Sequence, residues 1–195
     1  MADSKNICVY CSSSNAVDSI FFKAANDLAT LMAKRGHALV YGGACIGLMG
    51  ELAKTIHHNN GRVIGIMPES IKNKGICYEK ADELIITKSM QERKDILAAR
   101  SDAFIALPGG FGTLDEISEI ITLKQVGAHN KPVIILNINN YYDSLIGFFD
   151  NMYSHNFIKA EYRDSYYIAD SVEDCIRYIE EYTPISFADM FYYQI

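Results

Sequence analysis

Short apolar runs alternate along the chain with segments in which apolar residues recur every three or four positions. The runs are typical of strands buried on both faces, and the longer periodic segments are typical of amphipathic helices. Strands are predicted at residues 7–11, 38–41, 62–66, 83–87, 103–107 and 132–137, with a short one at 166–168. Strict alternation of strand and helix predicts an α/β fold, a Rossmann-like doubly wound parallel sheet with helices on both faces, in a single domain over residues 1–195.

Three turns rich in Gly or Ser follow predicted strands, at residues 12–15, 42–50 and 108–116. Right-handed crossovers place every strand-to-helix turn at the same edge of a parallel sheet. These turns, which are far apart in sequence, are therefore expected to face one crevice. The last of them, Pro108-Gly-Gly-Phe-Gly-Thr-Leu-Asp-Glu116, opens a helix, so its backbone amides suit a phosphate group.

The glycine spacing excludes two common nucleotide motifs. A dinucleotide fingerprint needs G-x-G-x-x-G with an acidic residue about 20 positions on, and neither Gly-rich turn has that spacing. Gly42 and Gly47 have the glycine spacing of a P-loop, but Leu48 and Met49 stand where Lys and Ser or Thr are required. Walker-type ATP hydrolysis is therefore not expected.

Two carboxylates, Asp115 and Glu116, lie in the turn that should bind an anion. One interpretation is structural, because Thr113 and Glu116 have the spacing of a capping box at a helix start. The other is that Glu116 addresses a different part of the same ligand. A ribose 5′-phosphate could contact both the backbone amides and Glu116, with its phosphate on the amides and its sugar near the carboxylate.

The helix predicted at residues 90–99 carries Arg93, Lys94 and, just beyond it, Arg100. Arg93 and Arg100 are seven residues apart and share one helical face. A solvated charged face is one interpretation of this spacing. The other is that Arg93 reaches the crevice, where a planar guanidinium holds a phosphate or hydroxyl more firmly than a lysine does.

Composition narrows the classes of partner. A net charge of −6 and a pI near 5.3 argue against a general nucleic-acid binder, which needs a dense basic surface. No apolar run is long enough for a membrane span, and the first residues lack the apolar core of a signal peptide, so a cytoplasmic protein is expected.

The cysteines and histidines do not predict a metal site or a disulfide framework. Five scattered cysteines fit reduced thiols, and Cys8 and Cys11 should point to opposite faces of a strand. His57 and His58 are adjacent in a helical segment, which is not a metal-ligand spacing, so a solvated helix face is expected. Residues 72–80 read as a polar surface loop. The aromatic segment 187–195 is expected to pack on the domain or on a partner subunit.

Several segments together resemble the Lonely Guy family of cytokinin riboside 5′-monophosphate phosphoribohydrolases, whose signature is PGGxGTxxE. The resemblance covers most of residues 7–158, with the motifs in the same order. It rests on the last turn and on Cys8-Val-Tyr-Cys-Ser-Ser-Ser14, Tyr41-Gly-Gly-Ala-Cys-Ile-Gly-Leu-Met-Gly50, Met90-Gln-Glu-Arg-Lys94, Ser101-Asp-Ala-Phe-Ile-Ala-Leu-Pro108 and Lys131-Pro-Val-Ile-Ile-Leu-Asn137.

The resemblance implies a homodimeric enzyme that hydrolyses the N-glycosidic bond of an N6-modified adenosine 5′-monophosphate, releasing free base and ribose 5-phosphate without metal or cofactor. It makes Arg93 and Glu116 catalytic. The implied substrate contacts are Ser13, Gly43, Gly47, Met90, Lys94, Gly109, Gly110, Phe111, Gly112, Thr113, Asp115 and Thr122. The chain departs from the family pattern at Ser12 and Ala44, where glycine is usual, and at Asp115, where glutamate is common.

Two alternatives to a phosphoribohydrolase remain open from the sequence. Related Rossmann-like proteins carry molybdenum cofactor without catalysis, although the presence of both Arg93 and Glu116 favours an enzyme. A lysine decarboxylase would need pyridoxal phosphate on a pocket lysine, and no lysine in the sequence has a setting that argues for this role.

Overall fold

The computed structural model describes residues 3–185, whose strands form one sheet with all neighbours parallel. The sheet order is β4-β3-β2-β1-β5-β6-β7. This order, which reverses direction after β1, is that of a doubly wound Rossmann-like sheet, as the sequence predicted. The strands are β1 Asn6–Tyr10, β2 Ala38–Tyr41, β3 Val63–Pro68, β4 Glu83–Thr87, β5 Ala103–Ala106, β6 Val133–Leu136 and β7 Tyr167–Ala169.

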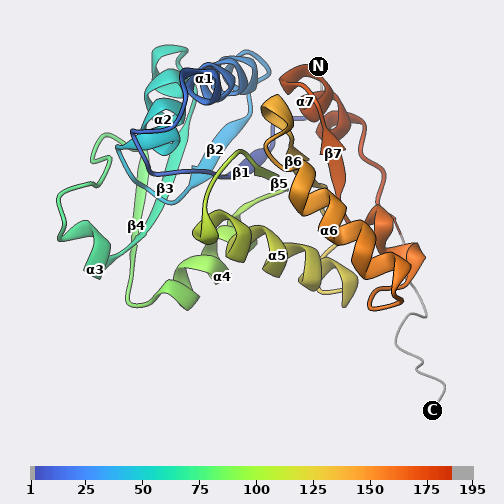
Figure 1. The fold of residues 1–195 in the computed structure, drawn as a ribbon. Coiled ribbons are helices and arrows are strands. Elements are labelled where there is room, and N and C mark those ends of the chain that lie inside the picture. The colour runs from blue at the N-terminus through green and yellow to red at the C-terminus, as the bar shows by residue number, and fades with distance from the viewer. Residues whose placement is uncertain (1–2, 186–195) are drawn as a thin grey trace.

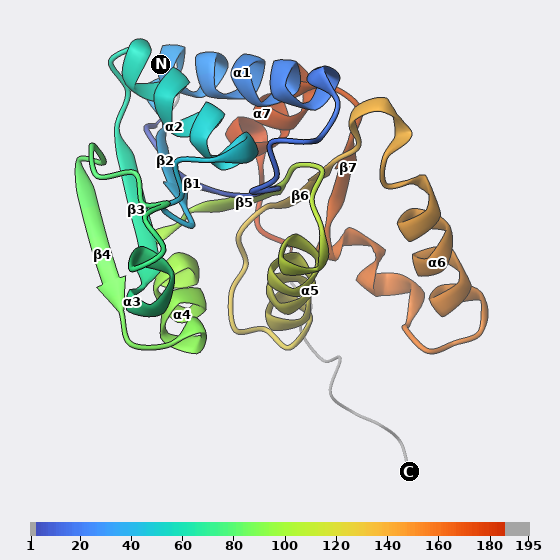
Figure 2. The same ribbon diagram turned by 60° about the vertical axis from the view of Figure 1, so that its left-hand side comes forward.

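Helices cover both faces of the sheet (Figures 1 and 2). Helices α1, α2 and α7 lie on one face, and α4, α5 and α6 lie on the other. Because α4 and α5 share a face and both pack against β1, their N-terminal ends can approach the same point. The helices are α1 Ser19–Lys34, α2 Gly47–His58, α3 Glu69–Lys72, α4 Met90–Arg100, α5 Phe111–Gln125, α6 Asp143–Ser154 and α7 Val172–Glu181, with 3₁₀ turns η1 Ile138–Asn140 and η2 Ala160–Ser165.

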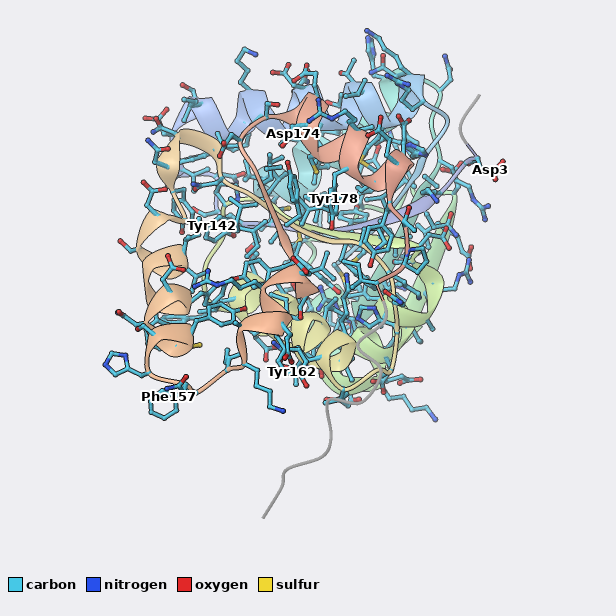
Figure 3. All side chains as sticks on the ribbon, turned by 90° about the vertical axis from the view of Figure 1, so that its right-hand side faces the viewer. Asp3, Tyr142, Phe157, Tyr162, Asp174 and Tyr178 are labelled. Atoms are coloured by element: carbon cyan, nitrogen blue, oxygen red, sulfur yellow. The ribbon has the colours of Figure 1, made fainter. Side chains whose placement is uncertain are left out.

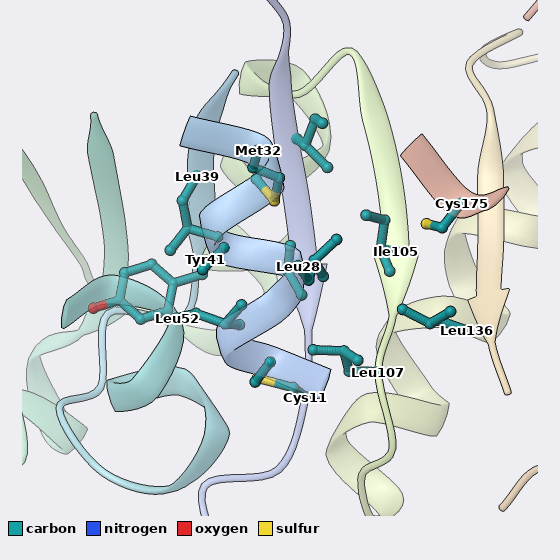
Figure 4. Close-up of a cluster of buried hydrophobic side chains, with 14 of the residues drawn as sticks. Cys11, Leu28, Met32, Leu39, Tyr41, Leu52, Ile105, Leu107, Leu136 and Cys175 are labelled. Carbon is teal, nitrogen blue, oxygen red and sulfur yellow. The ribbon is translucent and has the colours of Figure 1, made fainter. Parts of the chain in front are cut away.

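The side chains on the two faces of β1 pack into two separate hydrophobic cores. Ile7 and Val9 pack under α1 and α2, whereas Cys8 and Tyr10 pack under α4 and α5. Figure 4 shows part of the first core, in which Cys11 also lies. The prediction that Cys8 and Cys11 point to opposite faces is therefore confirmed, and both are buried free thiols.

Local sequence explains where several helices begin. Asp18 caps α1 by accepting a hydrogen bond from the Ile20 amide at 3.0 Å, and Ser89 and Ser171 cap α4 and α7 in the same way. Such caps satisfy amides that have no partner within the helix. The N-terminus of α5 is different, because no side chain caps it.

Two expectations need correction. His57 does not lie on a solvated helix face: its ring is half-buried, and its nitrogens lie 2.9 Å from the Tyr78 hydroxyl and 3.0 Å from Asp82. Residues 72–80, which were expected to form a loop, begin at the last residue of α3. An isolated antiparallel β-bridge between Ala44 and Cys77 joins them to the turn after β2. In both cases a contact from a distant segment decided the structure.

The remaining expectations concern the C-terminal segment, membrane spans and metal sites. The aromatic segment 187–195 lies outside the described residues. Within residues 3–185, no helix is both long and apolar enough to cross a membrane, and no group of three or more His, Cys, Asp or Glu side chains could hold a metal ion.

Candidate functional site

The three turns predicted to meet do converge on one cavity of about 380 Å³, at the carboxyl ends of β1, β2, β3 and β5. Ligand sites of doubly wound sheets lie at this edge, and the volume falls in the range of small-molecule pockets. The turn after β1 contributes Cys11, Ser12, Ser13 and Ser14, that after β2 contributes Gly42 and Ala44, and that after β5 contributes Gly110, Gly112, Thr113 and Glu116.

Arg93 of α4 and Glu116 of α5 form an ion pair in the wall of this cavity. Arg93 Nη1 donates to Glu116 Oε1 at 2.5 Å, and Arg93 Nε donates to the carbonyl oxygen of Ile66 at 3.1 Å. Their exposed fractions are only 5% and 6%. The guanidinium is thus fixed by two contacts, and it orients the carboxylate. The alternative of a solvated arginine face does not apply to Arg93.

Burial raises the pKa of Glu116 above its usual value, and the neighbouring Arg93 charge opposes that rise. The second carboxylate oxygen, Oε2, accepts no hydrogen bond from the described residues, and it is not enclosed, since Glu116 lines the cavity. This oxygen is therefore the one available to a ligand. Arg100, which shares a helical face with Arg93, instead pairs with Glu83 away from the cavity.

Gly42 lies against Arg93, a contact that the sequence does not predict. A Cβ atom added there would lie 2.4 Å from Arg93 Nη2. Because the guanidinium is held by Ile66 and Glu116, it has little room to move away. Only the absence of a side chain at Gly42 lets Arg93 lie against the strand end. The Gly42-Gly43 pair was a visible signal, but nothing local connects it to an arginine 51 residues on.

The first three amides of α5 are free, whereas the first two amides of α2 are not. Helix α5 begins at Phe111 after Gly110, and the amides of Phe111, Gly112 and Thr113 have no hydrogen-bond partner among the described residues. In α2, the Gly47 amide bonds to Asn15 Oδ1 at 2.8 Å and the Leu48 amide to the Ser12 carbonyl at 3.0 Å. Among the described residues, the N-terminus of α5 therefore has three successive free amides that suit an anion, whereas the first two amides of α2 are occupied.

The capping-box interpretation of Thr113 and Glu116 is wrong. Helix α5 begins two residues before Thr113, so Thr113 lies inside its first turn and Glu116 inside its second. The Thr113 side chain is buried against Gly109, where an added Cβ would approach its Oγ1 to 2.1 Å. Glu116 is thus not occupied in capping the helix.

Two tyrosines brace the turn from outside the cavity. The Tyr142 hydroxyl donates to the Leu107 carbonyl, and the Tyr141 hydroxyl donates to the Gly109 carbonyl, each at 2.7 Å. Both tyrosines follow η1, in which Asn139 and Asn140 have positive φ angles of 53° and 58°. The connection after β6 therefore helps to hold the backbone on which the free amides lie.

Several expected contact residues lie near the cavity without lining it. Lys94 pairs with Asp115 at 3.3 Å and with Glu119 at 3.2 Å, and the Phe111 side chain is 91% exposed. Thr122 lies further along α5, where its hydroxyl donates to the Ser118 carbonyl, in a different groove. Gly43, Gly47 and Gly109 shape the turns through close backbone approaches. Of the expected contacts, the cavity lining includes Ser13, Met90, Gly110, Gly112 and Thr113.

One wall of the cavity is apolar, and of its residues only Met90 was expected at the site. It consists of Met49 from α2, Met67 at the end of β3, Ile71 of α3, Ile76 and Met90. Residues 72–80, which include Ile76, were expected to be a surface loop because their sequence is mostly polar. Ile71 and Ile76 were the signal in the sequence, but single apolar residues in a polar segment do not predict a pocket wall.

The fold and this cavity define a class: a Rossmann-like protein with a nucleotide-type site built from a free helix N-terminus and a buried Arg–Glu pair. Comparison with known proteins then specifies the family. Residues 49–179 match the family described as "Possible lysine decarboxylase", so the chain belongs to that family.

The similar curated proteins are named phosphoribohydrolases. One cytokinin riboside 5′-monophosphate phosphoribohydrolase of Arabidopsis thaliana is 41% identical over 182 residues, covering 93% of this chain and 80% of that protein. A probable enzyme of the same name from Oryza sativa subsp. japonica is 40% identical over 181 residues, covering 93% and 80%. The resemblance inferred from the motifs is confirmed.

Solved structures with this fold include cofactor-binding proteins. The molybdenum cofactor binding protein of Rippkaea orientalis has a TM-score of 0.70 and 28% identity, covering 91% of this chain and 96% of that one. A Moco carrier protein from Chlamydomonas reinhardtii has a TM-score of 0.67 at 23% identity, covering 90% and 94%, and shows the shared fold alone.

Proposed function

We propose that this protein hydrolyses the N-glycosidic bond of an adenosine 5′-monophosphate, with or without an N6 substituent, to release the base and ribose 5-phosphate. The observation that carries this proposal is the Arg93–Glu116 pair in the same cavity as the free amides of Phe111, Gly112 and Thr113. The amides suit the phosphate, and the pair lies one helical turn away, where the sugar would be. The phosphoribohydrolase relatives, at about 40% identity, support it.

The chemistry follows from the charge that develops on the sugar. Cleavage of an N-glycosidic bond passes through an oxocarbenium-like transition state with positive charge near C1′. Glu116 Oε2, which faces the cavity, would stabilise that charge and orient the attacking water. A carboxylate held in place before reaction needs little reorganisation to do so. Arg93 would keep Glu116 ionised and oriented, since the arginine opposes the rise that burial causes in the glutamate pKa.

The apolar wall supports a purine carrying an apolar substituent. With the phosphate at the N-terminus of α5, the base would lie towards Met49, Met67, Ile71 and Ile76. Methionine side chains are flexible and polarizable, so they adapt to flat or irregular apolar groups. A prenyl group on N6 would bury its surface there.

The first test is release of free base from a panel of nucleotides. The protein is incubated with AMP, N6-isopentenyl-AMP, GMP and CMP, and the products are separated by chromatography. We expect free base from the adenine nucleotides, with the higher kcat/KM for the prenylated one. Absence of free base from all four, together with tight binding of a nucleotide, would overturn the proposal.

The second candidate function is non-catalytic cofactor carriage, which the similarity to the Rippkaea orientalis protein favours. A carrier needs the phosphate-binding turn but has no use for a buried carboxylate beside it. Base release in the panel experiment separates the two. The family description as a possible decarboxylase fits less well, because no lysine lines the cavity within residues 3–185 to hold pyridoxal phosphate.

We also propose that the protein is a cytoplasmic homodimer. Large apolar side chains are exposed on and around α5 and α6, among them Leu114, Val126, Phe148 and Phe157. Figure 3 shows Phe157 at the outer edge of the molecule after α6. A dimer interface over these helices would remove the four side chains from water. Sedimentation of the wild type and of Phe148→Asp would test it, with a shift from dimer to monomer expected.

A further inference from the structure

A second concave surface lies behind the wall of the main cavity, between α2 and the segment after β3. We call it the lysine hollow; it has a volume of about 750 Å³ and is lined by Lys54, Lys72 and Lys80 together with Cys45, Cys77 and Tyr78. It shares no lining residue with the main cavity. The proposed hydrolysis does not use it.

The three lysines of the hollow are not neutralised. None of them forms an ion pair with a described residue, although the chain as a whole has a net charge of −6. Glu79 is the one acidic residue of the lining within residues 3–185. Three ammonium groups around one hollow repel one another unless an anion lies between them. The lining therefore has an excess of positive charge in an acidic protein.

A buried hydroxyl without a partner lies beneath the hollow. Tyr41 is fully buried, and its hydroxyl accepts and donates no hydrogen bond. Burial raises the pKa of the Tyr41 hydroxyl, and Tyr78, Cys77 and Cys45, which line the hollow, raise it further. Figure 4 shows the hydroxyl pointing away from the other labelled core side chains. An unpaired buried hydroxyl is costly, and a buried water is the group that would pair with it. Because Tyr41 does not line the hollow, a ligand there would not contact this hydroxyl directly.

The hollow and the main cavity share a wall. In the segment from α3 to Tyr78, Ile71 and Ile76 face the main cavity, whereas Lys72 and Cys77 face the hollow. Two backbone hydrogen bonds of 2.8 Å, Cys45 N to Ile76 O and Tyr78 N to Gly43 O, attach this wall to the turn after β2. Helix α3 itself has no buried residue. A ligand in the hollow would hold the wall from its outer side.

We propose that the lysine hollow binds a compact anion with adjacent phosphate groups, of the pyrophosphate or polyphosphate class, and that the bound anion stabilises the wall formed by residues 71–78. Lysines bind such anions as mobile point charges, without the paired geometry that arginine imposes on a carboxylate. Lys72 and Lys80 would contact the anion from the wall and Lys54 from α2. The binding is expected to weaken with added salt.

The test is calorimetric titration of the full chain with inorganic pyrophosphate. We expect the dissociation constant to rise ~tenfold or more in the double variant Lys72→Ala/Lys80→Ala. The control is Lys34→Ala/Lys159→Ala, which removes the same charge from two exposed lysines elsewhere. It should change the constant by less than about twofold. Equal weakening in the two double variants, or no binding to the wild type, would overturn the proposal.

Two further measurements separate this site from the α5 turn. In Glu116→Gln protein saturated with AMP, pyrophosphate should still bind, since the α5 amides are then occupied and the hollow is not. Displacement by AMP would assign pyrophosphate to the turn and overturn the proposal. Hydrogen exchange of residues 71–78 should slow when pyrophosphate is bound, and unchanged exchange there would refute stabilisation of the wall.

Discussion

Arg93 Nη1 lies 2.5 Å from Glu116 Oε1, and this ion pair connects α4 to α5 at the carboxyl ends of the strands. Both groups are almost fully buried, and each has the other as its charged partner. The pair therefore has two consequences that can be separated by experiment. It positions a carboxylate in the cavity, and it links two helices whose packing defines that cavity.

Replacing Glu116 with Gln tests the carboxylate. The amide preserves size and leaves Arg93 a hydrogen-bond acceptor, but it removes the negative charge that would face C1′. We expect release of base from N6-isopentenyl-AMP to fall by a factor of about 10² to 10³, as for other preorganised electrostatic groups. The thermal unfolding midpoint is measured alongside. Turnover within a factor of two of wild type would remove Glu116 from the chemistry.

Replacing Arg93 with Ala tests the link between the helices. It leaves a buried carboxylate unpaired, and removal of one partner from a buried ion pair costs roughly 3–5 kcal/mol of unfolding free energy. Denaturant titration measures the loss. The double variant Arg93→Ala/Glu116→Gln should recover part of this stability, because no buried charge then remains. If the double variant is no more stable than Arg93→Ala, the pair is not the source of the loss.

Gly42→Ala tests the close approach of Arg93 to the end of β2. The added methyl group would lie 2.4 Å from Arg93 Nη2, so it should displace the guanidinium and lower kcat/KM by about tenfold or more. Gly147→Ala in α6 is the matched control. Nothing lies within 4 Å of its added methyl, and alanine favours a helix, so activity should be unchanged. Equal activities of the two variants would contradict the positioning role of Gly42.

Tyr142→Phe tests the brace behind the glycine turn. It leaves the Leu107 carbonyl without the donor that now lies at 2.7 Å, which should loosen the turn that carries the phosphate-binding amides. We expect KM for the nucleotide to rise several-fold with a smaller change in kcat. Tyr178→Phe on α7 is the control, because its ring stacks on Tyr167 and lines a groove separate from the main cavity; Figure 3 labels both tyrosines. A fall in kcat alone would argue against this role.

Lys124 makes stability depend on pH in the alkaline range. It is fully buried, with its Nζ 2.9 Å from the Tyr182 hydroxyl, and burial lowers its pKa from 10.5 to about 8. Between these values the unfolded chain holds a proton that the folded chain has lost, so unfolding takes up a proton. Raising the pH from about 8 to 10.5 should therefore stabilise the fold. Unfolding free energies of wild type and Lys124→Met should differ least at the alkaline end.

The sequence by itself determined the order of strands and helices, the parallel sheet and the convergence of its three turns. These features depend on local periodicity and on the handedness of crossovers, which neighbouring residues encode. The residues 108–116 were also recognisable, because their glycines and carboxylates are adjacent in the chain.

Only the tertiary structure decided what those residues do. Helix α5 starts at Phe111, so Glu116 is free from capping, and hydrogen bonds from the distant Tyr141 and Tyr142 hold the turn before it. The burial of Arg93 depends on a missing side chain at Gly42. The apolar wall, the lysine hollow and the buried Lys124 likewise arise where segments distant in sequence pack together. No pattern within one segment records such contacts, since burial is a property of the packed pair.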